Sequence, residues 1–181
     1  MSEREIHHTL TVPETLVPED LQRNALLTSV DAVYNWARRR SMWPLTFGLA
    51  CCALEMIAAG AARYDYGRLG MDIPFSSPRQ SDLLIISGTI THKMAPQLIR
   101  LWNQMPEPKY SIAMGACTVS GGTFDSYAVV QGAAELIPVD IYLPGCPPRP
   151  EALIYAFTKL HEMVGQQSVK TVSWYRKEGE A

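Results

Sequence analysis

The chain has 181 residues, which suits one domain with a sizeable core, because folding at this length buries roughly 70% of the surface that the unfolded chain exposes. Hydrophobic residues make up 47% and charged residues 19%, so the disordered and fibrous classes are excluded. Lys and Arg number 16 against 18 Asp and Glu, a formal net charge of -2, which argues against a general nucleic-acid binder.

The first residues, 1–28, are polar, contain two prolines and lack periodicity. They are predicted to form an extension that becomes ordered only against a partner. They also lack an apolar run behind a basic segment, so we expect an intracellular protein that is either prokaryotic or already processed. From Ser29 onward, Val30, Val33 and Trp36 have helical spacing, which predicts a helix ending at the basic run 38–40.

The segment Leu45–Ala62 is apolar and contains the adjacent pair Cys51 and Cys52. Its 18 residues just reach the length that a membrane span needs. Glu55 near its middle would cost about 2.5–3.5 kcal/mol in the bilayer. The segment is therefore predicted to be a buried or interface helix rather than a span.

Three short strand-like runs, residues 82–88, 110–115 and 139–145, each end in glycine. Helical patterns separate or follow them at 92–105, 124–137 and 150–164. This alternation predicts one α/β domain over residues 29–165, with a parallel sheet flanked by helices and a tail over 166–181.

The other two cysteines, Cys117 and Cys146, follow the second and third predicted strands. Because ligands of open α/β sheets bind at the carboxyl ends of the strands, these thiols are expected to share one space, which the cysteine doublet closes. The C-x2–4-C spacing of structural zinc and the C-x-x-C redox spacing are both missing. An iron–sulfur cluster tolerates the observed spacing, while four buried structural cysteines are the alternative. Arg79 and Arg149 are candidate cations beside such a cluster.

Four motifs then resemble one known family: WPLTFGLACCALEM, SPRQSDLLIISGTITHKMAP, MGACTVSGG and VDIYLPGCPPRPEAL. They are similar to the B subunit of NADH:quinone oxidoreductase, respiratory complex I, which in turn resembles the small subunit of nickel–iron hydrogenases. The resemblance runs from about Ser41 to Val164. It implies a flavodoxin-like α/β fold and an electron-transfer subunit of a translocase, with no independent activity and no catalytic side chains of its own.

The resemblance also implies one [4Fe-4S] cluster, the last in the chain from NADH, and a quinone headgroup beside it. The cluster ligands would be Cys51, Cys52, Cys117 and Cys146, with Arg79 and Arg149 nearby, and the quinone-side residues would be Trp43, Leu54 and Ile57. Expected partners are a hydrogenase-large-subunit-like subunit, other peripheral-arm iron–sulfur subunits, membrane-arm subunits, and ubiquinone or menaquinone. The expected location is the cytoplasmic side of the bacterial inner membrane, as a peripheral protein.

Two other interpretations remain open at this point. One is the small subunit of a membrane-bound hydrogenase-type complex, which is related to complex I. The other is a cluster-free structural subunit that only binds partners. The Gly-rich stretches do not form a dinucleotide fingerprint, so NADH and flavin are expected to bind elsewhere in the assembly.

Overall fold

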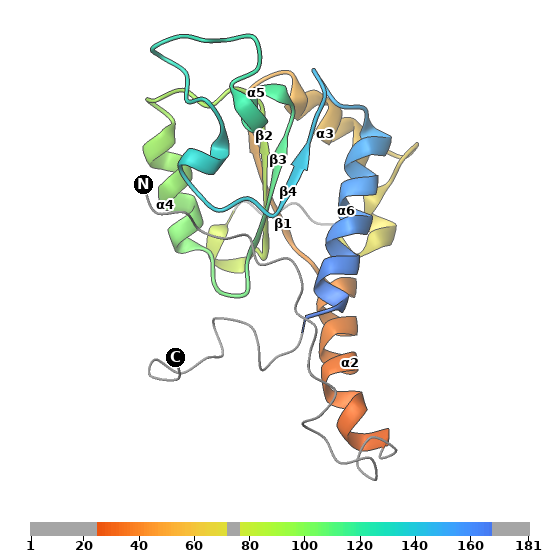
Figure 1. Ribbon diagram of the computed structural model, residues 1–181. Helices are drawn as coiled ribbons and strands as arrows, with labels where there is room; N and C mark the ends of the chain where they lie inside the picture. The colour runs from red at the N-terminus through yellow and green to blue at the C-terminus, as the bar shows by residue number, and fades with distance from the viewer. Residues whose placement is uncertain (1–24, 72–76, 168–181) are drawn as a thin grey trace, which may run out of the picture.

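The computed structural model describes residues 25–71 and 77–167 (Figure 1). A four-stranded parallel sheet lies at its centre, and its strands follow one another in chain order. The strands are β1 (Pro44–Gly48), β2 (Leu83–Ser87), β3 (Tyr110–Met114) and β4 (Ile141–Leu143). The predicted α/β fold, a parallel sheet flanked by helices, is confirmed.

Helices cover both faces of the sheet (Figure 1). One face carries α3 (Cys52–Gly60) and α6 (Pro150–Gly165), and the other carries α4 (Ala95–Gln104). Shorter elements connect these layers: α5 (Ala116–Ser120) and the 3-10 turns η2 (Tyr66–Leu69), η3 (Pro78–Gln80) and η4 (Ala133–Glu135). Among the described residues, none of the helices has the length and apolar character that a membrane crossing needs.

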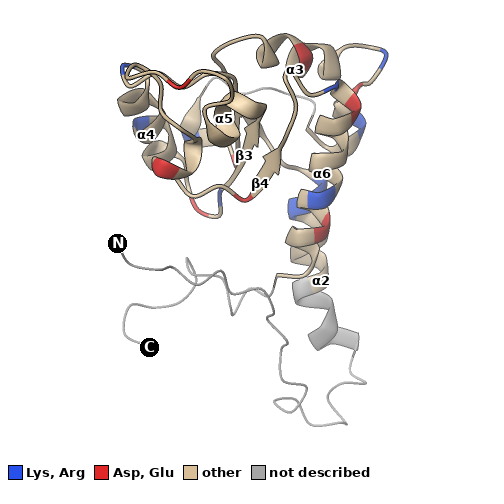
Figure 2. Cartoon of the chain, turned by 45° about the horizontal axis from the view of Figure 1, so that its top comes forward, with Lys and Arg blue, Asp and Glu red and all other residues tan. Residues whose placement is uncertain are grey.

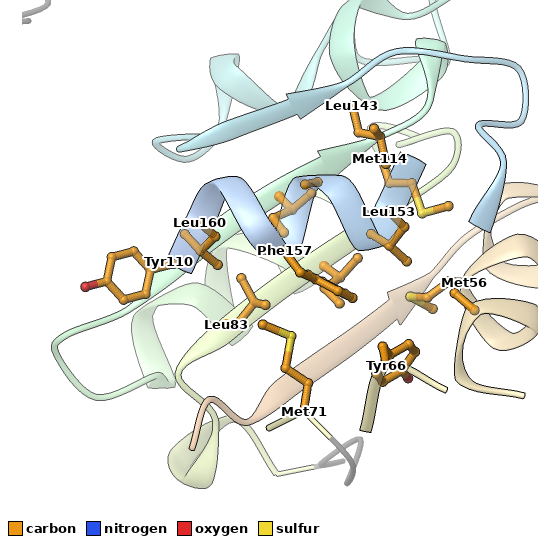
Figure 3. Packing of buried hydrophobic residues seen from close by; sticks show 14 of the residues in the cluster. Met56, Tyr66, Met71, Leu83, Tyr110, Met114, Leu143, Leu153, Phe157 and Leu160 are labelled. Carbon is orange, nitrogen blue, oxygen red and sulfur yellow. The ribbon is translucent and has the colours of Figure 1, made fainter. Parts of the chain in front are cut away.

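The second strand is the centre of the core, because all five of its residues are buried. Its side chains alternate between the faces, so Leu83 and Ile85 pack toward α3 and α6, while Leu84 and Ile86 pack toward α4. Figure 3 shows the first of these clusters, in which Phe157 of α6 is fully buried. Truncating such a side chain to alanine typically costs about 3–5 kcal/mol.

The helix α2 (Ala25–Arg40) leads away from the sheet and contacts α6 (Figure 1). Asn35 donates a hydrogen bond to the carbonyl of Gln167 at 2.5 Å, and Arg38 donates one to the hydroxyl of Tyr110. Basic residues lie on both helices where they meet (Figure 2). The predicted helix before Arg40 is therefore confirmed, although Val33 and Trp36 on its apolar positions are each 62% exposed.

Two of the predicted helices need correction. The segment Leu45–Ala62 is not one helix, because its first residues form the edge strand β1 and only Cys52–Gly60 are helical. Residues 124–137 are not a helix either: they form turns, an antiparallel bridge between Thr91 and Val129, and the turn η4. A positive φ angle of 120° at Gly132 interrupts a regular helix there.

The predicted domain boundaries fall close to the ends of the described residues. Helix α2 begins at Ala25, inside the predicted extension 1–28, and the remainder of that extension lies outside the described residues. In the predicted tail 166–181, Gln166 and Gln167 are described and follow α6, and residues 168–181 lie outside the described part.

Candidate metal centre

The cysteine doublet lies where β1 gives way to α3. The backbone N–H groups of Leu49 and Ala50 both donate to the carbonyl of Ser87, at 2.8 and 3.3 Å, which fixes this turn against the end of β2. Cys51 then occupies the N-cap position, and Cys52 is the first residue of α3. As a result the two thiols differ in environment: Cys52 is buried and Cys51 is exposed.

The other two cysteines lie at the same end of the sheet, beyond the carboxyl ends of β3 and β4. This end of the sheet, which carries Cys51, Cys52, Cys117 and Cys146, is called the cysteine edge. The N–H of Gly115 donates to the carbonyl of Leu143, and the N–H of Ala116 donates to the carbonyl of Gly145, both at 2.8 Å. These bonds join the segment that carries Cys117 to the loop that carries Cys146. Cys117 is buried in the short helix α5, which follows β3 directly.

Two glycines allow the cysteine-bearing segments to approach one another. A Cβ atom at Gly115, whose φ is 95°, would collide with the Sγ of Cys52. A Cβ at Gly122 would lie 3.3 Å from the Sγ of Cys117. The backbone of each glycine therefore lies directly against a thiol, as is required for a site that encloses sulfur atoms.

The four thiols influence one another electrostatically. Burial, followed by the neighbouring thiols of Cys51, Cys117 and Cys146, raises the pKa of the Cys52 thiol to about 11. All four are free cysteines. A thiolate at Cys52 is thus costly unless a cationic centre lies among the sulfurs, since metal coordination removes the thiol proton.

The arrangement fits a cluster better than a single ion. Among the described residues, no three His, Cys, Asp or Glu side chains gather closely enough to hold one metal ion. An iron–sulfur cubane is larger and takes one thiolate at each of four irons, so its ligands lie further apart than those of zinc. The residues present, four cysteines on one edge with glycine backbone against two of them, fit that group.

The two candidate arginines lie at opposite ends of the strands. Arg149 is the exposed N-cap residue of α6, three residues after Cys146. Arg79 is exposed on η3, before the amino end of β2 and close to α4. Since β2 has five residues, it separates Arg79 from the cysteine edge by roughly 16 Å. Only Arg149 lies on the cysteine side.

The three predicted quinone-side residues come from two segments, the helix α3 and the residue before β1. Leu54 and Ile57, 70% and 67% exposed, lie one turn apart on α3, beyond the cysteine doublet. Trp43 is 40% exposed and precedes β1 at the opposite edge, where its carbonyl accepts hydrogen bonds from the N–H groups of Asp82 and Leu83. Leu54 and Ile57 thus lie one turn apart on α3, and Trp43 lies directly before β1, the strand that precedes this helix.

A cavity of about 390 Å³ opens beside α3. Its lining residues come from β1, α3 and the segment around η2: Thr46, Met56, Ile57, Gly60, Ala61, Tyr66 and Gly67. Its volume is in the range of small-molecule sites. Of these lining residues, only Ile57 was among the predicted quinone-side residues. Met56 was not, although it lies four residues after Cys52 and therefore on the same side of the helix.

Comparisons with known proteins agree with this geometry. Residues 50–160, which include all four cysteines, match the family model described as NADH ubiquinone oxidoreductase, 20 Kd subunit. An NADH-quinone oxidoreductase subunit of Roseiflexus castenholzii is 55% identical over 157 residues, or 86% of this chain and 59% of that protein. An NAD(P)H-quinone oxidoreductase subunit of Trichormus variabilis is 58% identical over 163 residues, or 89% of this chain and 66% of that protein.

The coverage of the relatives varies. The chain spans less than two thirds of the length of the Roseiflexus and Trichormus proteins. It covers 80% of an NADH-quinone oxidoreductase subunit of Solibacter usitatus, to which it is 53% identical over 150 residues.

Two solved structures share the fold. One is the membrane-bound sulfane sulfur reductase, an archaeal respiratory membrane complex, with a TM-score of 0.72 and 38% identity over 82% of each chain. The other is an NAD+-reducing [NiFe]-hydrogenase, with a TM-score of 0.51 and 18% identity over 68% of this chain and 93% of that one. The hydrogenase comparison concerns the fold alone and agrees with the predicted hydrogenase-like architecture. Taken with the matched family model and the relatives, the cysteine edge identifies this chain as a member of the family of the 20 kDa subunit of NADH:ubiquinone oxidoreductase.

Proposed function

We propose that this chain holds one [4Fe-4S] cluster on Cys51, Cys52, Cys117 and Cys146 and passes electrons from it to a quinone. The observation that carries the proposal is the convergence of four free cysteines from three separate segments on one edge of the sheet. Such a cluster accepts and donates one electron at a time. The chain acts as a subunit of an NADH:quinone oxidoreductase and has no activity alone.

The residues of this chain have separate tasks in that role. The four thiolates bind the irons, and the glycine backbone at Gly115 and Gly122 leaves room for the sulfurs. Arg149 contributes positive charge on the cysteine side, which favours the more negative, reduced state of the site. Burial of Cys52 and Cys117 excludes water from half of the ligand set.

The quinone headgroup binds on the α3 side of the cluster. The cavity beside α3 supports this placement, because it is bounded by Met56, Ile57 and Tyr66 and lies one helical turn beyond Cys52. A subunit resembling the hydrogenase large subunit covers the exposed side chains of Leu54 and Ile57 and completes the pocket. Trp43, directly before β1, is the third residue proposed to lie on the quinone side.

The other partners are subunits of the same complex. Peripheral-arm iron–sulfur subunits deliver electrons from NADH, and membrane-arm subunits hold this chain at the cytoplasmic face of the inner membrane as a peripheral protein. Ubiquinone or menaquinone is the acceptor, and the assembled complex couples its reduction to ion translocation.

A second candidate function is that of the small subunit of a membrane-bound complex with another terminal acceptor. The specific observation in its favour is the 38% identity to a chain of the sulfane sulfur reductase complex over 82% of both chains. The two candidates share the cluster and differ in the acceptor. Assays of the purified complex with a short-chain ubiquinone and with inorganic polysulfide distinguish them.

Low-temperature electron paramagnetic resonance on the purified complex tests the main proposal. The wild type is compared with Cys117→Ala and Cys146→Ala, and iron and acid-labile sulfide are measured in parallel. We expect each substitution to remove one [4Fe-4S] signal and quinone-dependent NADH oxidation, while NADH oxidation by an artificial acceptor survives. If both variants keep every cluster signal and the quinone activity, the four thiols are structural and the proposal fails.

A further inference from the structure

Met56 lies on α3, one helical turn after Cys52, and lines the cavity beside this helix. It is only 4% exposed, yet it contributes to the cavity lining together with Ile57 and Tyr66. It follows Cys52 by four residues on α3, so the two side chains lie on the same face of the helix. Figure 3 shows Met56 at the α3 end of the buried cluster, with Tyr66 nearby. Its side chain therefore forms a wall of the cavity on the helix face that also carries Cys52.

The Met56 thioether has a specific neighbour. The hydroxyl oxygen of Ser87, at the end of β2, lies 3.3 Å from the Sδ of Met56 and 3.5 Å from the Sδ of Met114. Ser87 is fully buried. Because a hydroxyl has one proton, Ser87 can donate to one thioether at a time, and Met56 is the closer acceptor.

The main chain of Ser87 also supports the cysteine doublet. Its carbonyl accepts the hydrogen bonds from Leu49 and Ala50 that fix the turn before Cys51. Ser87 thus makes two kinds of contact. Its carbonyl accepts hydrogen bonds from the turn that leads to the cluster ligands, and its hydroxyl donates to the side chain that lines the cavity. A flexible, unbranched methionine has many rotamers, so a donor that selects one of them fixes the shape of the cavity.

We propose that Ser87 is a positioning residue that holds the Met56 thioether as a wall of the cavity, and that this wall sets the affinity for the quinone headgroup. The inference rests on the proposed function, because it assumes that the cavity receives the quinone. It concerns binding and shape, and Met56 itself undergoes no change of oxidation state.

Four variants of the purified complex test this role: Ser87→Ala, Met56→Leu, the double variant Ser87→Ala/Met56→Leu and, as a matched control, Met114→Leu. Both leucine substitutions conserve side-chain volume in the core, and each leaves the Ser87 hydroxyl with one thioether acceptor. They differ in that only Met56 lines the cavity among the described residues. Binding of a radiolabelled short-chain ubiquinone is measured by equilibrium dialysis, and KM, kcat and the cluster signal are measured on the same samples.

We expect Ser87→Ala and Met56→Leu each to weaken ubiquinone binding and raise KM by about fivefold, which corresponds to about 1 kcal/mol, the typical value of one hydrogen bond. The double variant should bind no more weakly than either single variant, because both remove the same contact. Met114→Leu should leave binding and KM within about twofold of the wild type. The cluster signal should persist in all four variants.

Equal quinone affinity in the wild type, Ser87→Ala and Met56→Leu would overturn the inference, as would additive effects in the double variant or an effect of Met114→Leu as large as that of Met56→Leu. If one single variant fails to assemble, the other still gives the comparison with Met114→Leu. Failure of the proposed function looks different, since the wild-type complex itself would then lack the cluster signal or fail to bind ubiquinone.

Discussion

At the scale of single residues, Gly115 determines whether the two cysteine-bearing segments can meet. Its φ of 95° and the position of Cys52 Sγ leave no place for a Cβ atom. Gly115→Ala should therefore cost about 1–3 kcal/mol of backbone strain and displace the Cys52 thiol, with loss of cluster iron. Iron analysis of the purified complex measures this loss.

Gly165→Ala is the matched control for Gly115→Ala. A Cβ at Gly165 would lie 3.1 Å from Nη1 of Arg39, the end of a long side chain that can move aside. This variant should keep the full iron content. Wild-type iron content in Gly115→Ala would contradict the account of the cysteine edge.

Arg149 and Arg79 allow a comparison of two exposed arginines that differ in their place on the sheet. Removing positive charge near the proposed cluster disfavours its reduced state. Exposed charge pairs contribute about 0.2–1 kcal/mol, so Arg149→Gln should lower the reduction potential of the cluster by about 10–40 mV. Redox titration followed by paramagnetic resonance measures the potential. Arg79→Gln should leave it unchanged, and a larger shift from Arg79 than from Arg149 would show that Arg149 has no such role.

At the scale of elements, sequence patterns predicted the helices and strands whose periodicity reflects burial. The run 82–88 predicted a strand, and its residues LLIIS form β2. Helix α6 begins at Pro150, with Leu153, Phe157 and Leu160 buried as its spacing indicates. The pattern failed over 124–137, where Phe124 and Tyr127 are exposed and backbone pairing with Thr91 replaces helical bonds. That pairing joins distant segments, so no local pattern records it.

The contact between α2 and α6 predicts a dependence of stability on pH. Burial, followed by the charges of Arg39 and Arg40, lowers the pKa of His161 below its usual value of 6.5. The unfolded chain therefore binds this proton more readily than the folded chain, so the contribution of His161 is fully present above pH 6.5 and is lost as the pH falls through the lowered pKa. The Nε2 atom is buried without a hydrogen-bond partner among the described residues, which adds to the cost of protonation.

Thermal unfolding of the purified full chain, followed by circular dichroism at about pH 7.5 and about pH 5.5, measures this dependence. His161→Gln should show a smaller loss of Tm at the lower pH than the wild type. His92→Gln, at an exposed histidine before α4, should behave as the wild type does. The same loss of Tm in the wild type and in His161→Gln would rule out the assigned role of His161.

At the scale of the whole molecule, strand topology alone predicts that Cys117 and Cys146 share the carboxyl ends of the strands. The cysteine doublet is positioned by β1, which the sequence did not predict as a strand. The cavity could not be predicted in that way. Its lining combines Thr46 of the edge strand, Met56 of α3 and Tyr66 of η2, and the edge strand itself was taken for part of a helix.

The exposed side chains of α3 predict which face of the chain the partner subunit covers. Leu54 and Ile57 are 70% and 67% exposed on the side where the hydrogenase-large-subunit-like partner is proposed to bind. An aspartate at either position would be buried without a partner on assembly, at a cost of several kcal/mol, so Leu54→Asp and Ile57→Asp should weaken association by about a hundredfold or more. Ile99→Asp, on α4 across the sheet and 37% exposed, is the aliphatic control and should assemble normally. Co-purification of the remaining subunits with a tagged chain measures the outcome. If all three variants recover the complex equally well, α3 is not the face that the partner covers, and the quinone pocket must lie elsewhere on the chain.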